Sequence, residues 1–136
     1  NLLLEHVVIN EVMPRATTGS DEWIELYNPS IAPVDLSSWY LKDAAGSFLG
    51  SLEGTTINGG DFVVVHCTHR LNDGGDAVML YNGDNSEIDA VAYTSAELGK
   101  SFMRTTDGGV WVDEPKEPTQ GVSNCRTSVV INEVMP

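Results

Sequence analysis

Hydrophobic and polar residues alternate along the chain in short runs, the pattern of β-strands that pack one or both faces against other residues. In the second run, Ile24 and Leu26 share one face while Glu25 lies on the other. Turn-forming Gly, Pro, Asn and Asp residues separate the runs, which excludes long helices. Eight or nine short strands at this spacing predict an all-β sandwich or barrel. The predicted strands are 7–12, 22–28, 39–42, 61–66, 77–81, 87–93, 101–104 and 110–112.

An eight-residue repeat is the most specific feature of the sequence. VVINEVMP occupies residues 7–14 and returns unchanged at 129–136, an offset of 122. That offset is the size of a small β domain, so we interpret the second copy as the first strand of a following, similar domain. The alternative is one fold with two equivalent strands.

The repeat also divides the chain. Residues 1–6 are a leader or an expression remnant, 7–124 form the β-sandwich, and 125–136 are a linker plus the first strand of the next repeat. The segment 113–125 contains two prolines and few apolar groups, which predicts extended surface chain leading out of the fold.

Composition and charge limit the classes of partner that the chain can bind. Of the 136 residues 41% are hydrophobic, enough to bury a single core. Seven Lys and Arg stand against twenty Asp and Glu, a net charge of −13 that repels phosphate and disfavours nucleic-acid binding. The chain contains no run of eighteen apolar residues, so no membrane-spanning segment is predicted.

Six segments together resemble the lamin tail domain, in the form found in prokaryotic proteins. They are INEVMP at 9–14, DEWIELYNPS at 21–30, VDLSSWYLKD at 34–43, LNDGGDAVMLYN at 71–82, EIDAVAY at 87–93 and SFMR at 101–104. The resemblance implies an immunoglobulin-like β-sandwich. In animals such domains end nuclear intermediate-filament proteins and bind proteins and sometimes DNA. In bacteria and archaea they are attached to secreted or surface proteins, often beside hydrolases.

The acidic surface and the lack of a heptad segment depart from the nuclear lamins. We therefore expect a non-catalytic interaction or spacer module of a secreted or cell-surface protein of a bacterium or archaeon, with neighbouring domains of the same kind as partners. The alternative is an accessory domain that delivers an extracellular hydrolase or nuclease to its substrate. An intracellular scaffold like the nuclear lamins is a third reading. No cofactor is expected.

Two groups of side chains invite a chemical role. His66-Cys67-Thr68-His69 combines two imidazoles with a thiol, but His66 and Cys67 point to opposite faces of a strand, which favours a strand end over a metal or nucleophile site. Acidic residues around two turns are calcium candidates, although no EF-hand pattern is present. The alternative is that they hydrogen-bond their own turns. They are Asp73, Asp76, Asp84, Glu87 and Asp89.

Charged and sulfur-containing residues predict two structural pairings. A carboxylate in the middle of a strand is costly to bury alone, so Arg104 is expected to form an ion pair with Glu25 or Glu11. Cys67 and Cys125 form a disulfide or remain two separate thiols, and the sequence leaves both open.

Aromatic residues and the second repeat are candidates for binding. Five aromatic residues form either an exposed platform for sugars or peptides or ordinary packing within the fold. Trp111 is expected to be the most exposed tryptophan. The other members of this set are Trp23, Trp39, Tyr27 and Tyr40. The second repeat is expected to pair with a neighbouring molecule, by strand exchange or by pairing with a sheet edge, and so to give dimers or chains through 129–136. Its exchanging residues are Val129, Val130, Ile131, Asn132, Glu133 and Val134.

Overall fold

A computed structural model describes residues 6–68 and 70–124 of the chain. Within them the chain forms nine strands and no helix, and accordingly no helix that could span a bilayer. The strands are β1 (Val8–Met13), β2 (Glu22–Tyr27), β3 (Val34–Asp35), β4 (Tyr40–Asp43), β5 (Thr56–Ile57), β6 (Phe62–Cys67), β7 (Asp76–Tyr81), β8 (Glu87–Tyr93) and β9 (Phe102–Met103).

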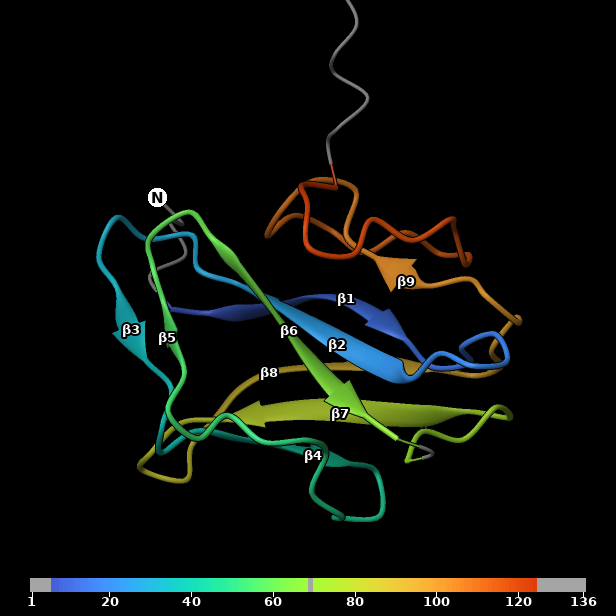
Figure 1. The fold of residues 1–136 in the computed structure, drawn as a ribbon, viewed down its shortest axis with the longest axis horizontal. Coiled ribbons are helices and arrows are strands. Elements are labelled where there is room, and N and C mark those ends of the chain that lie inside the picture. Colours follow the sequence, from blue (N-terminus) through green and yellow to red (C-terminus); the bar gives the residue numbers. More distant parts are fainter. Residues whose placement is uncertain (1–5, 69, 125–136) are drawn as a thin grey trace, which may run out of the picture.

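Two antiparallel sheets form the layers of a sandwich (Figure 1). One has the strand order β6-β2-β1-β9 and the other β4-β7-β8, while β3 and β5 form a small two-stranded sheet. Ile24 and Leu26 of the first layer and Val78 and Leu80 of the second are fully buried in one hydrophobic core. The all-β, immunoglobulin-like sandwich predicted from the sequence is confirmed.

Most predicted strands form, but the prediction and the structure differ in two places. The predicted strand 110–112 is reduced to a single bridge between Trp111 and Arg104. The two-residue strands β3 and β5 were not predicted, because they are too short to show an alternating pattern.

The prediction of extended surface chain at 113–125 is wrong. The chain folds back over β9, where the backbones of Ser101 and Lys116 exchange hydrogen bonds of 2.9 and 2.8 Å. Further along, Thr119 is buried at 6% exposure. Residues 104–124, here called the end lobe, lie together beyond β9 (Figure 1). Buried carboxylates beneath the end lobe explain why so polar a segment is ordered there.

The first repeat lies in the centre of its sheet. β1 pairs with β2 on one side and with β9 on the other, and every residue from Val7 to Pro14 is buried. A β-bulge at Asn10 shifts the register between Ile9 and Glu11 and leaves Asn10 without a partner in β2. This irregular point of the sheet carries most of the polar chemistry described below.

Candidate functional site

Two carboxylates face each other across β1 and β2. Glu11 is the direct partner of Glu25 in the antiparallel register, and both side chains are at 0% exposure. Like charges at opposed positions destabilise a sheet, and a buried carboxylate without hydrogen bonds is costly. The pair therefore depends on donors from elsewhere in the chain.

Neutral donors surround both carboxylates. Glu11 accepts hydrogen bonds from the Ser101 hydroxyl (2.6 Å) and from the backbone N–H (2.8 Å) and hydroxyl (2.6 Å) of Thr119. Glu25 accepts one from the Asn10 amide (3.1 Å) and one from the Gly121 backbone N–H (2.7 Å). Hydrogen bonds to ionised acceptors are stronger than neutral ones, so these contacts offset much of the burial cost.

Asp107 is the third member of this carboxylate network. Its side chain accepts hydrogen bonds from the Asn10 amide (3.2 Å), the Ser123 hydroxyl (2.6 Å) and the Asn124 backbone N–H (2.8 Å). Residues 119–124, here called the clasp, thus bind all three carboxylates. Because the clasp contributes backbone N–H groups at fixed positions, it positions the end lobe firmly on β1 and β2.

Burial sets the protonation of Glu25. Loss of solvent raises the pKa of Glu25 to about 7, against the opposing hydrogen bonds from Asn10 and Gly121. The charges of Glu11 and Asp107 are smaller contributions to the same rise. Near neutral pH the protonated and the ionised forms of Glu25 are therefore both populated.

Arg104 has a different partner from the one predicted. Its guanidinium forms an ion pair with Asp89 (2.9 Å), donates to the carbonyl of Ile9 (2.8 Å) and lies 4.7 Å from the centre of the Trp111 ring. The prediction that Arg104 pairs with Glu25 or Glu11 is corrected. β8 runs beside β1 and brings Asp89 to Arg104, and alternation alone does not indicate that neighbour.

The calcium candidates serve other contacts. Asp76 accepts hydrogen bonds from the backbone N–H groups of Ala44, Asn72 and Ala77. Asp73 pairs with Arg15, and Asp89 pairs with Arg104.

Asp84 and Glu87 are exposed at the β7–β8 turn, where the Asn82 side chain accepts the Asp84 backbone N–H. In the described part of the chain no three His, Cys, Asp or Glu residues are grouped so that they could hold a metal ion.

The histidine and cysteine cluster is split by its strand. His66 is exposed and Cys67 is buried on the opposite face of β6. Burial, together with the charges of Glu22 and Asp21, raises the pKa of the Cys67 thiol to about 12, so the thiol is protonated and poorly nucleophilic at neutral pH. His69 and Cys125 lie outside the described residues, so the Cys67–Cys125 disulfide stays a prediction.

The three tryptophans of the predicted aromatic set are wholly or partly buried. Trp23 is buried, and Trp39 and Trp111 are half-buried against the core. Trp111 lies under Arg104, so it is not the exposed tryptophan expected from the sequence.

Two tyrosines of the set stack on other rings. Tyr27 stacks on Phe62 with ring centres 5.1 Å apart, and Tyr40 stacks on Tyr81 at 4.9 Å. These contacts are packing between neighbouring strands.

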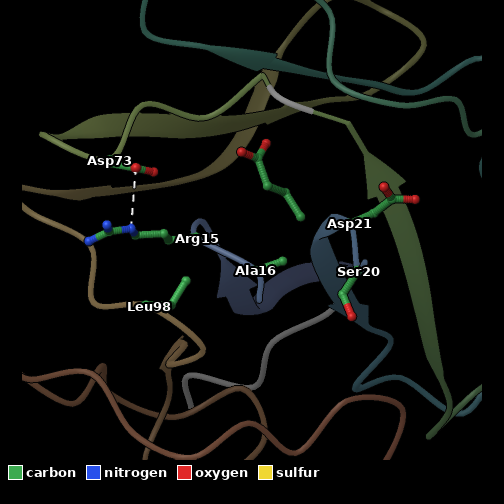
Figure 2. A pocket seen from close by; sticks show the side chains of 7 residues that line it. Arg15, Ala16, Ser20, Asp21, Asp73 and Leu98 are labelled. Atoms are coloured by element: carbon green, nitrogen blue, oxygen red, sulfur yellow. Dashed lines mark ion pairs between the residues drawn. The ribbon is translucent and has the colours of Figure 1, made fainter. Parts of the chain in front are cut away.

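A polar pocket of about 200 Å³ opens beside the β1–β2 connection (Figure 2). Arg15 and Asp73, which line it, face each other at 3.3 Å in an ion pair. Another of its carboxylates, Glu22, accepts the backbone N–H groups of Arg70 and Leu71. Three of its charged groups, those of Arg15, Asp73 and Glu22, are therefore engaged with protein partners.

A more apolar groove of about 420 Å³ lies in the end lobe, lined in part by Met103, Val112, Thr119 and Asn124. Its walls come from β9 and the end lobe, including both ends of the clasp. The groove therefore adjoins the point at which the described chain ends.

Sequence reasoning missed the donors of the carboxylate network. The polar Asn10-Glu11 pair inside an otherwise apolar repeat is a signal that this strand has polar partners. Thr119 and Gly121 give no such signal, because backbone N–H donors are common to almost every residue type.

The comparison with protein families agrees with this geometry. The model of the lamin tail domain matches residues 4–95, about two-thirds of the chain. The match spans β1 to β8 and so contains Glu11 and Glu25, but it ends before the donors of the end lobe. No curated protein and no solved structure matches the chain. The matched strands and their sandwich show that the chain belongs to the lamin tail domain family.

Proposed function

We propose that this chain is a non-catalytic interaction and spacer module whose partner is a neighbouring domain of the same kind, in a secreted or cell-surface protein of a bacterium or archaeon. The observation that carries the proposal is the repeat. All eight residues of its first copy are buried, so each has a packing role within the fold. The coarser function agrees with the family, because lamin tail domains are immunoglobulin-like and generally non-catalytic.

The central position of β1 limits how the second copy can act. β1 is already paired on both sides, by β2 and β9, so an identical strand cannot take the same central position in this domain. Asn132 and Glu133 correspond to Asn10 and Glu11, so the second copy needs its own set of carboxylate donors. A following domain with its own end lobe would supply them.

The repeat allows a two-domain chain to be made without a foreign linker: residues 1–136 followed directly by residues 15–136. We expect two folded domains, because residues 129–136 then stand where 7–14 stand in the first. Calorimetry should give about twice the unfolding enthalpy of the single chain, since this enthalpy scales with the number of ordered residues. An unfolded second half would contradict the proposal.

A matched pair of substitutions shows which copy of the repeat each domain requires for folding. In the two-domain chain, Ile131→Asp should abolish folding of the second domain alone, because its counterpart Ile9 is fully buried. In the 136-residue chain the same substitution should leave the melting temperature of the domain unchanged, whereas Ile9→Asp should unfold it. Equal effects of the two substitutions in the 136-residue chain would contradict a separate role for the second copy.

Strand exchange is the corresponding proposal for the 136-residue chain alone. Residues 129–136 can enter a second molecule only if its β1 is displaced, so dimers should form slowly and more readily under mildly denaturing conditions. Light scattering would detect dimers or longer chains, and Ile131→Asp should return the mass to that of a monomer. Unchanged dimers in this variant would exclude exchange through the second repeat.

A further inference from the structure

We propose that an apolar surface at the end lobe is the docking surface for the following domain, so that successive domains are held at a fixed angle. The surface consists of the end-lobe residues Val110, Val112 and Val122 and is here called the exit surface. It has this role only if the function proposed above holds, because its partner is the domain that would begin at residue 129.

The exit point of the chain is fixed. Asn124 donates its backbone N–H to Asp107 (2.8 Å), and its side-chain amide donates to the carbonyl of Arg104 (2.9 Å). Two residues earlier in the clasp sequence Val122 donates its backbone N–H to Thr119 (3.0 Å). The chain therefore leaves the domain at one place, held against β1 and the end lobe.

The connection to the next domain is short. Only residues 125–128 separate Asn124 from the second repeat, and a fully extended chain covers about 17 Å between residues 124 and 129. A domain of this size has a radius of gyration of about 13 Å. The start of the next domain is thus closer than the width of one domain, which brings the two surfaces together at the exit.

Apolar side chains are exposed at this end of the molecule. Val110 is 71% exposed and Val122 is 46% exposed, although neither packs in the core. The backbones of both are bonded to residues that line the groove: the Val110 carbonyl accepts the N–H of Thr105, and the Val122 N–H donates to the carbonyl of Thr119. Val112, which is half-buried, lines the groove itself. Exposed apolar residues beside a groove are typical of an interaction site.

Charge favours an apolar contact here. Two domains of such negative charge repel each other, so a stable contact requires a surface with little acidic character at its centre. The three residues of the exit surface carry no charge, and the groove is lined by two basic residues, Arg104 and Lys116, and one acidic residue, Glu117. The chemistry of this surface therefore suits another acidic domain of the same kind.

The test uses the two-domain chain, residues 1–136 followed by 15–136. NMR relaxation should show both domains tumbling with one rotational correlation time, and small-angle scattering should show a narrow distribution of interdomain distances. Val110→Glu with Val122→Glu in the first domain should shorten the correlation time toward that of a single domain and broaden the distances, while both domains stay folded.

The matched control is Ile31→Glu, which places a charge at a fully exposed residue of the β2–β3 loop and should change neither measurement. Two folded domains that tumble independently before any substitution would overturn the docking surface and leave the proposed function intact. A second domain that does not fold would overturn both. A double variant that tumbles like the unsubstituted chain would show that the exit surface makes no contact.

Discussion

The two polar sites along β1 hold their charges in different ways. At Ile9 the backbone N–H and carbonyl bind Asp89 and Arg104, which form an ion pair with each other. At Glu11 the opposed carboxylates have no cation in contact among the described residues, and the neutral donors of the end lobe hold them. The first site depends on two side chains, whereas the second depends on the path of a distant backbone segment.

This difference explains why the ion pair was predicted at the wrong site. A mid-strand carboxylate was expected to require a basic partner, and Arg104 was the nearest candidate. Backbone N–H groups and hydroxyls perform that task instead, at distances of 2.6 to 2.8 Å for Glu11. In this fold Glu11, the acidic residue of the repeat, therefore binds donors of the end lobe rather than a cation.

Removal of the clasp should have the largest effect. A chain ending at Pro118 loses five hydrogen bonds to the three carboxylates. Glu11 and Glu25 are the fully buried members, and an unsatisfied buried group costs about 1–3 kcal/mol and more when charged, so their loss is a large part of the stability of a typical domain. Circular dichroism at neutral pH should show an unfolded or barely folded chain. A chain ending at Asn124 is the control, and equal melting temperatures for the two would refute the role of the clasp.

Removal of the cation at the other site should have a smaller effect. Arg104→Met leaves Asp89 and the Ile9 carbonyl without their donor and should lower the free energy of unfolding by about 3 kcal/mol. Arg15→Met, which breaks the exposed pair with Asp73, should cost less than about 1 kcal/mol. Denaturant titration measures both, and equal losses would show that the buried ion pair has no special weight.

The pH dependence of stability should show the smallest difference between the carboxylate network and the Arg104–Asp89 ion pair. The pKa of Glu25 is about 7 in the folded domain and close to the ordinary glutamate value of 4.5 when the chain is unfolded. Between these values the folded state binds more protons, so the contribution of Glu25 to stability is present at acidic pH and declines as pH rises through 7.

Between pH 8 and pH 5, Glu25 should raise the free energy of unfolding by about 2 kcal/mol or less. Glu25→Gln should remove this gain, and the difference between the two chains in denaturant midpoint measures it. The same pH profile for both chains would mean that Glu25 ionises normally in the folded state.

Much of the fold could be predicted from the sequence, because alternation reports burial directly. β2 and β6 show this most clearly, since their apolar residues meet in one sheet with the register Ile24 to Val65. The end lobe could not be predicted, because its order comes from hydrogen bonds rather than from a periodic apolar face. Thr119 lies 108 residues from Glu11, in a proline-containing segment that resembles a linker when read alone.

The central claim is that residues 129–136 are the first strand of another domain of this fold. Amide hydrogen exchange of the two-domain chain tests it directly, because each repeat would be the central strand of a sheet. We predict that the backbone N–H groups of 130–135 are protected as strongly as those of 8–13. Rapid exchange at 130–135 beside a protected first repeat would contradict the account.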